Sequence, residues 1–287
     1  MGSERPRGSL WIVGTPIGNL EDLSARALET LSRADAIFCE DTRVTAKIAS
    51  RFSISAARIS CPAPRETARV PDLLRRLEAG ETVALVSDAG MPAVSDPGQG
   101  LVAAAAEAGF PVFVVPGPSA ISSALALSGL PAVPHTFLGF LPSRAGERRR
   151  LLEARSASPD TLVWFESPHR ISDSLADAAA VLGPRRAVVA REITKLHEEV
   201  VRGSLSELAA TFAARGAGRG EMTVVVEGAA PSRPVTADED LDAAIRNALA
   251  QGTDKRSIAR DLATRCGRAA REIYARAVAL AGEGRDP

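Results

Sequence analysis

Short apolar runs alternate with longer amphipathic stretches along the first part of the chain. The apolar runs predict buried strands at 10–13, 36–39, 82–86 and 112–115. Apolar residues at helical spacing predict helices at 23–33, 45–52, 73–77 and 98–108. Strands that alternate with helices indicate βα units and a largely parallel sheet, so the predicted fold class is α/β.

A second block of the chain has the same alternation but ends differently. Its apolar runs predict strands at 136–141, 161–165, 187–190, 199–202 and 222–227. Its amphipathic stretches predict helices at 119–127, 147–155, 171–182 and 205–215. The strands at 187–190 and 199–202 follow one another without a helix between them, which favours antiparallel pairing.

The last part of the chain has a different pattern. The segment GAAPSRPVT at 228–236 has the composition of a linker. Beyond it, residues 238–281 predict three helices and no strand. We therefore divide the chain into an α/β domain over 1–117, a second α/β domain over 118–230, and a small all-helical module over 237–287.

The composition excludes several classes of protein. Basic and acidic residues number 35 each, so the net charge is zero and any basic surface must be local. Cys39, Cys61 and Cys266 lie far apart without a CxxC pair, so we expect neither a disulfide framework nor a metal site. The N-terminus lacks the apolar core of a signal peptide, and no apolar run approaches the roughly 20 residues of a membrane span. We expect a soluble cytoplasmic protein with no membrane partner.

The segment LVSDAGMPAVSDPG at 85–98 is the first candidate for chemistry. It follows a predicted parallel strand, and open α/β sheets bind ligands at the carboxyl ends of their strands. Its glycines allow a ligand to approach the backbone closely, and its prolines restrict the loop. Asp88 at the strand tip can accept hydrogen bonds from a ribose or an amine. Asp96 is either a site residue or a cap for the helix that begins near Gly98.

Three other strand ends resemble this one in composition. They are Gly14–Asn19 (GTPIGN), Glu40–Arg43 (EDTR) and Pro116–Ala120 (PGPSA). None contains GxGxxG or the GK[ST] of a P-loop, so neither nucleotide fingerprint applies. Each segment alone is consistent with a simple turn, but four such loops at one sheet edge indicate a ligand site.

These loops belong to a larger set of motifs. The set consists of TPIGNLED, CEDTR, LVSDAGMPAVSDPG, PGPSA, FLGFLPSR, ESPHRI, REITKLHEE and RGEMTVVVEG. In the order and spacing of these motifs, the chain resembles the ribosomal RNA small subunit methyltransferase I family, whose members have the tetrapyrrole-methylase fold. The likeness covers about residues 9–228.

The resemblance implies a fold, a reaction and partners. It implies two α/β domains with S-adenosylmethionine (SAM) bound in the cleft between them. It implies methylation of a cytidine ribose 2′-hydroxyl in the decoding region of 16S ribosomal RNA, in the small ribosomal subunit. It also implies a homodimer and no metal.

The cofactor contacts that we assign follow from these motifs. Met91 stands where a threonine is common in the family, so a backbone contact there would survive but a hydroxyl contact would not. The assigned SAM contacts are Thr15, Pro16, Asp88, Ala89, Gly90, Met91, Pro92, Ser119, Ala120, Phe165, Glu166, Met222 and Thr223.

A ribose hydroxyl is a weak acid and a poor nucleophile. Methyl transfer to it is therefore helped by a general base that takes its proton or by a cation that stabilises the developing charge. We assign catalysis to Glu40, Asp41, Arg43 and Lys195. Arg43 either grips a phosphate through its guanidinium fork or forms an internal pair with Asp41. Lys195 is otherwise a solvated loop charge. Further candidate bases are Glu166, His169 and Glu192, and further candidate cations are Arg170 and Arg191.

RNA binding requires a positive surface. We assign substrate contacts to Arg43, Arg144, Arg148 and Arg170. Arg144 and Arg148 belong to an arginine-rich stretch that also fits an ordinary exposed helix face. The stretch continues through Arg149, Arg150 and Arg155.

The C-terminal helices offer a second basic region. Residues 255–280 resemble a helix-turn-helix, which fits a module lying on RNA phosphates. They also fit a packing appendage with a small apolar core. That core would consist of Ile258, Leu262, Ile273 and Val278.

Two other functions remain open from the residues. One is a methyltransferase for a tetrapyrrole or another small acceptor. The other is a non-catalytic nucleic-acid-binding protein that uses the C-terminal helices. The basic clusters disfavour the first, and the loop constellation would have no purpose in the second.

Overall fold

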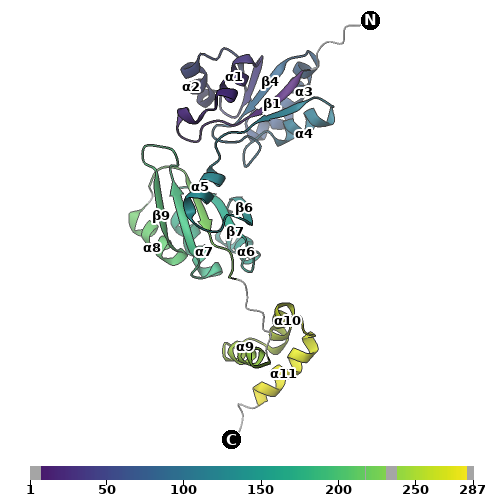
Figure 1. The fold of residues 1–287 in the computed structure, drawn as a ribbon, viewed down its shortest axis with the longest axis vertical. Coiled ribbons are helices and arrows are strands. Elements are labelled where there is room, and N and C mark those ends of the chain that lie inside the picture. Colours follow the sequence, from purple (N-terminus) through teal and green to yellow (C-terminus); the bar gives the residue numbers. More distant parts are fainter. Residues whose placement is uncertain (1–7, 217, 231–237, 283–287) are drawn as a thin grey trace. The chain divides into compact units, whose positions relative to one another are not determined.

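The computed structural model describes residues 8–216, 218–230 and 238–282. The chain divides into two compact units, Met1–Gly228 and Ala229–Pro287 (Figure 1). The larger unit holds two five-stranded sheets, and the smaller unit is helical. The strands of the larger unit that precede residue 118 form one sheet, and those that follow it form the other.

The first sheet is parallel throughout and has the strand order β3-β2-β4-β1-β5. Its strands are β1 (Ser9–Val13), β2 (Ala36–Cys39), β3 (Ala57–Ser60), β4 (Thr82–Val86) and β5 (Val112–Val115). The crossovers contain η1 (Leu20–Asp22), α1 (Ala25–Arg33), α2 (Thr42–Phe52), η2 (Ala63–Arg65), α3 (Glu66–Glu78) and α4 (Gln99–Glu107). Parallel strands need such long crossovers, because a tight turn reverses the chain direction and can join only antiparallel neighbours.

Helices cover both faces of this sheet. Successive strand residues point to opposite sides, so neighbouring residues of one strand pack under different helices. Ile37 packs on one face in a cluster that includes Leu31 of α1 and Ile48 of α2. Phe38 packs on the other face in a cluster that includes Leu73 of α3 and Leu101 of α4. Because the inner strands β2 and β4 are buried on both faces, their tips are the places where polar side chains reach solvent.

The second sheet is mixed and has the strand order β6-β7-β10-β8-β9. Only β6 and β7 are parallel; the other neighbours are antiparallel. Its strands are β6 (His135–Phe140), β7 (Thr161–Glu166), β8 (Arg186–Arg191), β9 (Glu199–Ser204) and β10 (Met222–Val226). Its helices are α5 (Ala120–Ser128), α6 (Ala145–Glu153), α7 (Ile171–Leu182) and α8 (Leu205–Arg215). The antiparallel pairing expected for β8 and β9 is therefore confirmed.

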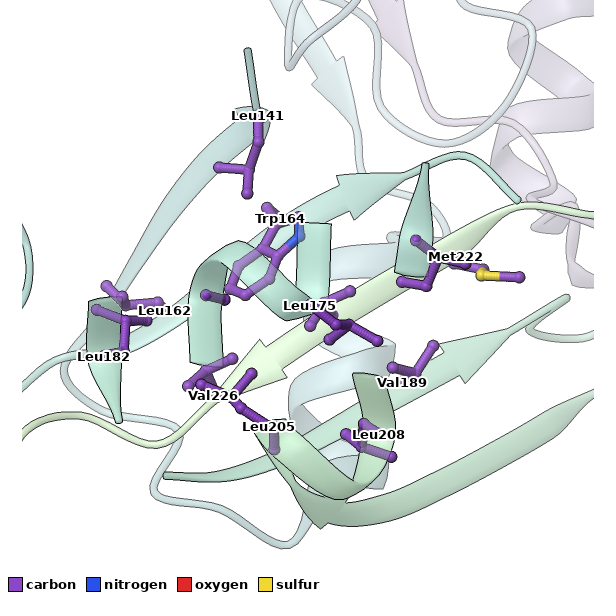
Figure 2. Packing of buried hydrophobic residues seen from close by; sticks show 14 of the residues in the cluster. Leu141, Leu162, Trp164, Leu175, Leu182, Val189, Leu205, Leu208, Met222 and Val226 are labelled. Atoms are coloured by element: carbon purple, nitrogen blue, oxygen red, sulfur yellow. The ribbon is translucent and has the colours of Figure 1, made fainter. Parts of the chain in front are cut away.

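Two apolar layers sandwich the second sheet. Figure 2 shows Trp164 of β7 beside Leu175 of α7, with Leu205 and Leu208 of α8 farther along the same buried face. On the other face, Leu125 of α5 packs in a separate cluster with β-strand residues, joined by Ile17 and Ile193 from loops at the strand ends. These two loop residues connect the packing of the sheet with the region where the strands end.

The sequence predictions fail at one strand and one long helix. The pattern missed β3, because this edge strand carries exposed Ala57 and Arg58 rather than an apolar run. It also placed only 73–77 in the helix α3, whose first turns are polar and contain Pro71. The apolar runs of the central strands β2 and β4 predicted their bounds correctly.

The smaller unit contains α9 (Asp238–Ala250), α10 (Lys255–Cys266) and α11 (Ala270–Gly282), with no strand in its described residues. Ile258, Leu262 and Ile273 lie in its core as expected, but Val278 is 43% exposed and does not. Asp254 caps α10 and Gly267 ends it in the left-handed conformation. Most of the expected linker lies outside the described residues. Within the described chain, none of the helices is long and apolar enough to cross a membrane.

Candidate cofactor and substrate site

A cavity of about 280 Å³ lies in the larger unit, where loops from both sheets meet. This volume is near the lower end of the range for small-molecule sites, about 300 Å³ and above. Most of the residues that we assigned to SAM line it: Ala89, Gly90, Met91, Ser119, Ala120, Phe165, Glu166, Met222 and Thr223. Thr15, Pro16, Asp88 and Pro92 do not line it.

Backbone hydrogen bonds join the loop after β1 to the loop after β4, which forms part of the cavity wall. Thr15 and Gly90 exchange backbone hydrogen bonds of 2.9 and 3.1 Å, and the Thr15 hydroxyl donates to the Ser87 carbonyl at 3.1 Å. Gly90 has φ +83°, a conformation that favours glycine. Thr15 is fully buried, so it holds the loop after β4 in place and does not itself contact a molecule in the cavity.

A second close approach joins the first loop to the PGPSA loop. A Cβ atom on Gly14 would lie 2.7 Å from the backbone of Gly117, and one on Gly117 would lie 2.8 Å from Gly14. Any larger residue at either position would push the two loops apart. The glycines are therefore required by backbone-to-backbone packing beside the cavity.

The stretch from Ala93 to Asp96 forms part of the cavity edge under strain. Ala93 and Ser95 have φ of 65° and 66°, in the left-handed region that side chains disfavour. Asp96 lines the cavity, and burial followed by the nearby charge of Asp88 raises its pKa, although a hydrogen bond from Ser87 opposes this. The N-cap of α4 is Gly98, and the Gly100 and Leu101 amides of its first turn donate to the Glu66 carboxylate. The alternative that Asp96 caps this helix is therefore wrong.

Asp88 lies in a separate hollow with Glu40, Asp41 and Arg43, at the ends of β2 and β4. Its Oδ1 accepts a hydrogen bond from the Asp41 amide at 3.0 Å, which ties the two strand tips together. Burial and then the charge of Asp41 raise the pKa of Asp88 against that hydrogen bond. Burial and the charge of Asp88 likewise raise the pKa of Glu40.

Asp41 and Arg43 form the internal pair that we gave as the alternative to phosphate binding. Arg43 Nε lies 3.0 Å from Asp41 Oδ1, and Nη2 lies 2.6 Å from Oδ2. The Arg43 side chain and then its amide lower the pKa of Asp41 to about 2. The Arg43 side chain is nevertheless 89% exposed, so the guanidinium remains open to a phosphate.

Glu166 ends β7 and is the most buried carboxylate of the cavity wall, with 2% of the residue exposed. Its Oε1 accepts a hydrogen bond from the Ser167 amide at 2.9 Å, and Arg170 Nε lies 3.5 Å from the same oxygen. Within the described residues, its Oε2 has no hydrogen-bond partner. The side chain itself is 0% exposed, so this oxygen is enclosed by protein and does not open into the cavity.

Arg170 and Arg148 are turned inward, onto the segment that follows β6. Arg170 Nη2 donates to the carbonyls of Leu141 and Pro142, at 2.6 and 3.0 Å. Arg148 is 4% exposed; its Nε donates to Asp177 at 2.7 Å and its Nη1 to the carbonyls of Pro142 and Ser143. Burial leaves Arg148 no surface for RNA, so we correct its assignment to a residue that holds this segment.

Arg144 is the arginine of this segment that remains at the surface. Its side chain is 83% exposed, with a contact of 3.3 Å to Glu147. Arg149 donates to Asp177 from the solvent side at 2.6 Å. Burial would raise the pKa of Asp177, but the hydrogen bonds from Arg149 and Arg148 outweigh it and the pKa is lowered.

Lys195 is held behind the cavity wall by two carboxylates. Its Nζ donates to Glu192 at 2.8 Å and to Glu221 at 3.0 Å, and Glu221 lines the cavity. Burial would lower the pKa of Lys195, but these hydrogen bonds outweigh it and raise the pKa. Lys195 is therefore a cation at neutral pH and not a base. Glu192 has φ 52°. Burial would raise its pKa, but hydrogen bonds from the Lys195 side chain and the Glu221 amide outweigh burial and lower the pKa.

Several lining residues were missed from the sequence. They include Ile17, Val94, Ser95, Phe140, Ser167, Pro168, Ile193 and Glu221, which all line the cavity and belong to the quoted motifs. Their place within a motif was the available signal. His169 is exposed and does not line the cavity. In the described residues, acidic, cysteine and histidine side chains form no cluster that could hold a metal.

Comparison with known proteins identifies the family. The family model described as Tetrapyrrole (Corrin/Porphyrin) Methylases matches residues 9–209. A protein of Synechocystis sp. named ribosomal RNA small subunit methyltransferase I is 40% identical over 279 residues, covering 96% of this chain and all of that one. The chain belongs to the ribosomal RNA small subunit methyltransferase I family.

Other members of the ribosomal RNA small subunit methyltransferase I family agree. The relative from Thermotoga maritima is 45% identical over 77% of this chain and 99% of its own length. The one from Micromonospora olivasterospora is 46% identical over 85% of this chain and 77% of its length.

Solved structures show the same fold. Diphthine synthase matches 77% of this chain and 90% of its own, with a TM-score of 0.62 at 16% identity. Uroporphyrin-III-C-methyltransferase from Thermus thermophilus matches 76% of this chain and 94% of its own, with a TM-score of 0.54 at 22% identity. At such identities the likeness to these structures concerns the fold alone.

Proposed function

We propose that this chain transfers a methyl group from SAM to the 2′-hydroxyl of a cytidine ribose in the decoding region of 16S ribosomal RNA. The observation that carries the proposal is the family: relatives at 40–46% identity over most of the chain bear the name ribosomal RNA small subunit methyltransferase I. The cavity supports it, because most of the residues that we assigned to SAM line one hollow.

The residues of the cavity fit SAM. Its lining combines the apolar residues Ile17, Phe165 and Met222 with polar ones that include Asp96 and Ser119. Small-molecule sites have this composition, mostly apolar with a few polar groups that orient the ligand. When bound, SAM supplies a methyl carbon already activated by its sulfonium. The chain's main task is then to align the hydroxyl oxygen with that carbon.

The assigned catalytic residues fall into two groups. Lys195 holds Glu221 in the cavity wall and provides a fixed positive charge beside it. Glu40, Asp41 and Arg43 occupy the hollow with Asp88, where the exposed Arg43 guanidinium suits an RNA phosphate. Asp96, in the cavity wall with a raised pKa, is a further candidate to accept the proton of the hydroxyl.

The partners and the location belong to the same proposal. The small ribosomal subunit as substrate would place the protein in the cytoplasm, and the resemblance implies a homodimer. Arg144 and the C-terminal helices would add contacts to RNA phosphates. Light scattering of the purified protein should give twice the mass of one chain.

The direct test is methyl transfer from labelled SAM to small subunits that lack the native modification. Naked 16S RNA and a porphyrin precursor run in parallel, and the methylated nucleotide is mapped. We expect label on a cytidine 2′-oxygen in RNA. Label on the porphyrin alone would support a small-acceptor methyltransferase instead. SAM binding without label in any acceptor would mean that the acceptor is misidentified.

A further inference from the structure

Phe140, the last residue of β6, presents an aromatic ring at the edge of the cavity. It lines the cavity, yet 58% of the residue is exposed. Of the other Phe, Trp and Tyr residues of the described chain, Phe113 and Tyr274 are exposed to a smaller extent, 46% and 39%, and neither lines the cavity. An aromatic ring at the edge of a cavity offers a flat apolar surface to a bound partner.

A bulge in β6 aims this ring. Phe137 lies opposite Val163 in the register with β7, whereas Phe140 lies opposite Phe165, so β6 has one extra residue between them. Strand residues three apart normally face opposite sides. Here both rings contact Phe165, with centroids 4.9 Å away for Phe137 and 5.5 Å away for Phe140. The bulge, with Gly139 at φ +65°, therefore turns Phe140 onto the cavity side.

The chain beyond the ring is held in place. Leu141 is buried, and Arg170 donates to the carbonyls of Leu141 and Pro142. Arg148 donates to the carbonyls of Pro142 and Ser143 at 3.2 Å. A platform positioned in advance loses little conformational entropy when a partner settles on it. The same anchored segment ends at the exposed Arg144, whose charge suits a phosphate of the partner.

We propose that Phe140 is the stacking platform for the base of the nucleotide that receives the methyl group. This inference rests on the proposed function. A ribose hydroxyl that reaches into the cavity brings its own base to the cavity edge, because base and hydroxyl belong to one nucleotide. Such a nucleotide must leave its neighbours in the RNA stack, and an aromatic side chain replaces that lost stacking. The occupant is therefore a single-stranded RNA base.

The test compares Phe140→Leu, which removes the ring but keeps an apolar side chain, with Phe140→Tyr, which keeps the ring. Phe113→Ala is the matched control, because it removes an exposed ring from the edge strand β5, away from the cavity. Each protein is assayed for methyl transfer to unmodified small subunits. SAM affinity is measured by calorimetry, and the elution volume is recorded.

Phe140→Leu should lower kcat/KM for the subunit between about fivefold and about a hundredfold, the range of one stacked base. Its SAM affinity should stay within about twofold of wild type, and Phe140→Tyr and Phe113→Ala should keep most of the activity. Equal losses of SAM affinity and activity would instead make Phe140 part of the cofactor wall. A changed elution volume would mean that a second copy covers the ring. Unchanged kinetics, or an equal loss in Phe113→Ala, would also overturn the proposal.

The wild-type protein separates this proposal from the one on which it rests. If wild type transfers no methyl group to RNA, the proposed function fails and the assignment of Phe140 fails with it. If wild type methylates RNA and Phe140→Leu does so equally well, only the assignment of Phe140 fails.

Discussion

Glu166 shows how burial decides what a motif residue does. Its carboxylate is buried, one oxygen is bound to the Ser167 amide, and the other has no partner in the described part of the chain. Leaving a buried acceptor unsatisfied costs free energy, about 1–3 kcal/mol or more for a charged group. Sequence motifs pointed to this position as a cofactor contact, but its side chain is 0% exposed and lies beside Arg170, so it is enclosed by protein rather than open to the cavity.

The substitution Glu166→Gln tests that placement. The amide keeps the size of the side chain but loses its charge and half of its acceptor capacity. SAM affinity, measured by calorimetry, should stay within about twofold of wild type, because the enclosed side chain does not open into the cavity. Glu227→Gln is the control, because Glu227 follows β10 at the end away from Met222 and does not line the cavity. A loss of SAM affinity in the Glu166 variant alone would mean that its carboxylate binds the cofactor.

The helices α6 and α7 are joined by an ion pair that also fixes the chain beyond β6. Asp177 of α7 binds Arg148 and Arg149 of α6, and Arg148 reaches the carbonyls of Pro142 and Ser143. Asp177 and Arg148 are both buried, so losing either would leave an uncompensated charge. This pair therefore contributes to the placement of Phe140 and Arg144 as well as to stability.

Asp177→Asn should lower the free energy of unfolding of the larger unit by about 3–5 kcal/mol at pH 7. Since the folded pKa of Asp177 is lowered, its stabilisation is present above the unfolded pKa of about 4 and is lost as the pH falls through the folded pKa. The gap between wild type and variant should accordingly shrink in acid. Urea unfolding followed by tryptophan fluorescence measures it, because Trp11 and Trp164 both lie in this unit.

Glu147→Gln provides the comparison for this measurement. It alters the exposed contact with Arg144 on the same helix, and such pairs contribute about 0–1 kcal/mol. A gap between wild type and Asp177→Asn that stays constant from neutral pH to acid would contradict the account of Asp177.

The molecule as a whole consists of a larger unit that contains the cavity and a helical unit with its own core. Residues 246–285 carry nine basic side chains and four acidic ones, although the whole chain is neutral. Several of these charges are engaged, as Arg276 is with Asp242. A local surplus of this kind on a separate core fits a contribution to RNA affinity rather than to methyl transfer itself.

A protein ending at residue 230 tests the smaller unit. It should bind SAM as tightly as the full chain, because every cavity-lining residue lies before that point. Its affinity for small subunits should fall, and the slope of log affinity against log salt should become shallower because fewer phosphates are neutralised. Filter binding at several salt concentrations measures both. An unchanged slope would favour the packing appendage over an RNA contact.

The local pattern of the sequence was sufficient for most elements and for the position of the site along the chain. Apolar runs placed β2 and β4, and the glycine- and proline-rich loops after the strands pointed to the cavity. These features follow from neighbours in sequence, since backbone conformation and burial period are local properties. The edge strand β3 escaped, because its pairing with β2 and not its own composition makes it a strand.

Tertiary structure alone separated the roles of similar residues. Asp88 and Glu166 both follow or end strands and both belong to quoted motifs, yet one ties β4 to β2 and the other is enclosed beside Arg170. Arg144 and Arg148 stand four apart in one arginine-rich stretch, yet one is exposed and the other buried against Asp177. Which side chain faces a ligand depends on contacts between segments distant in sequence, and residue type and spacing carry no record of those contacts.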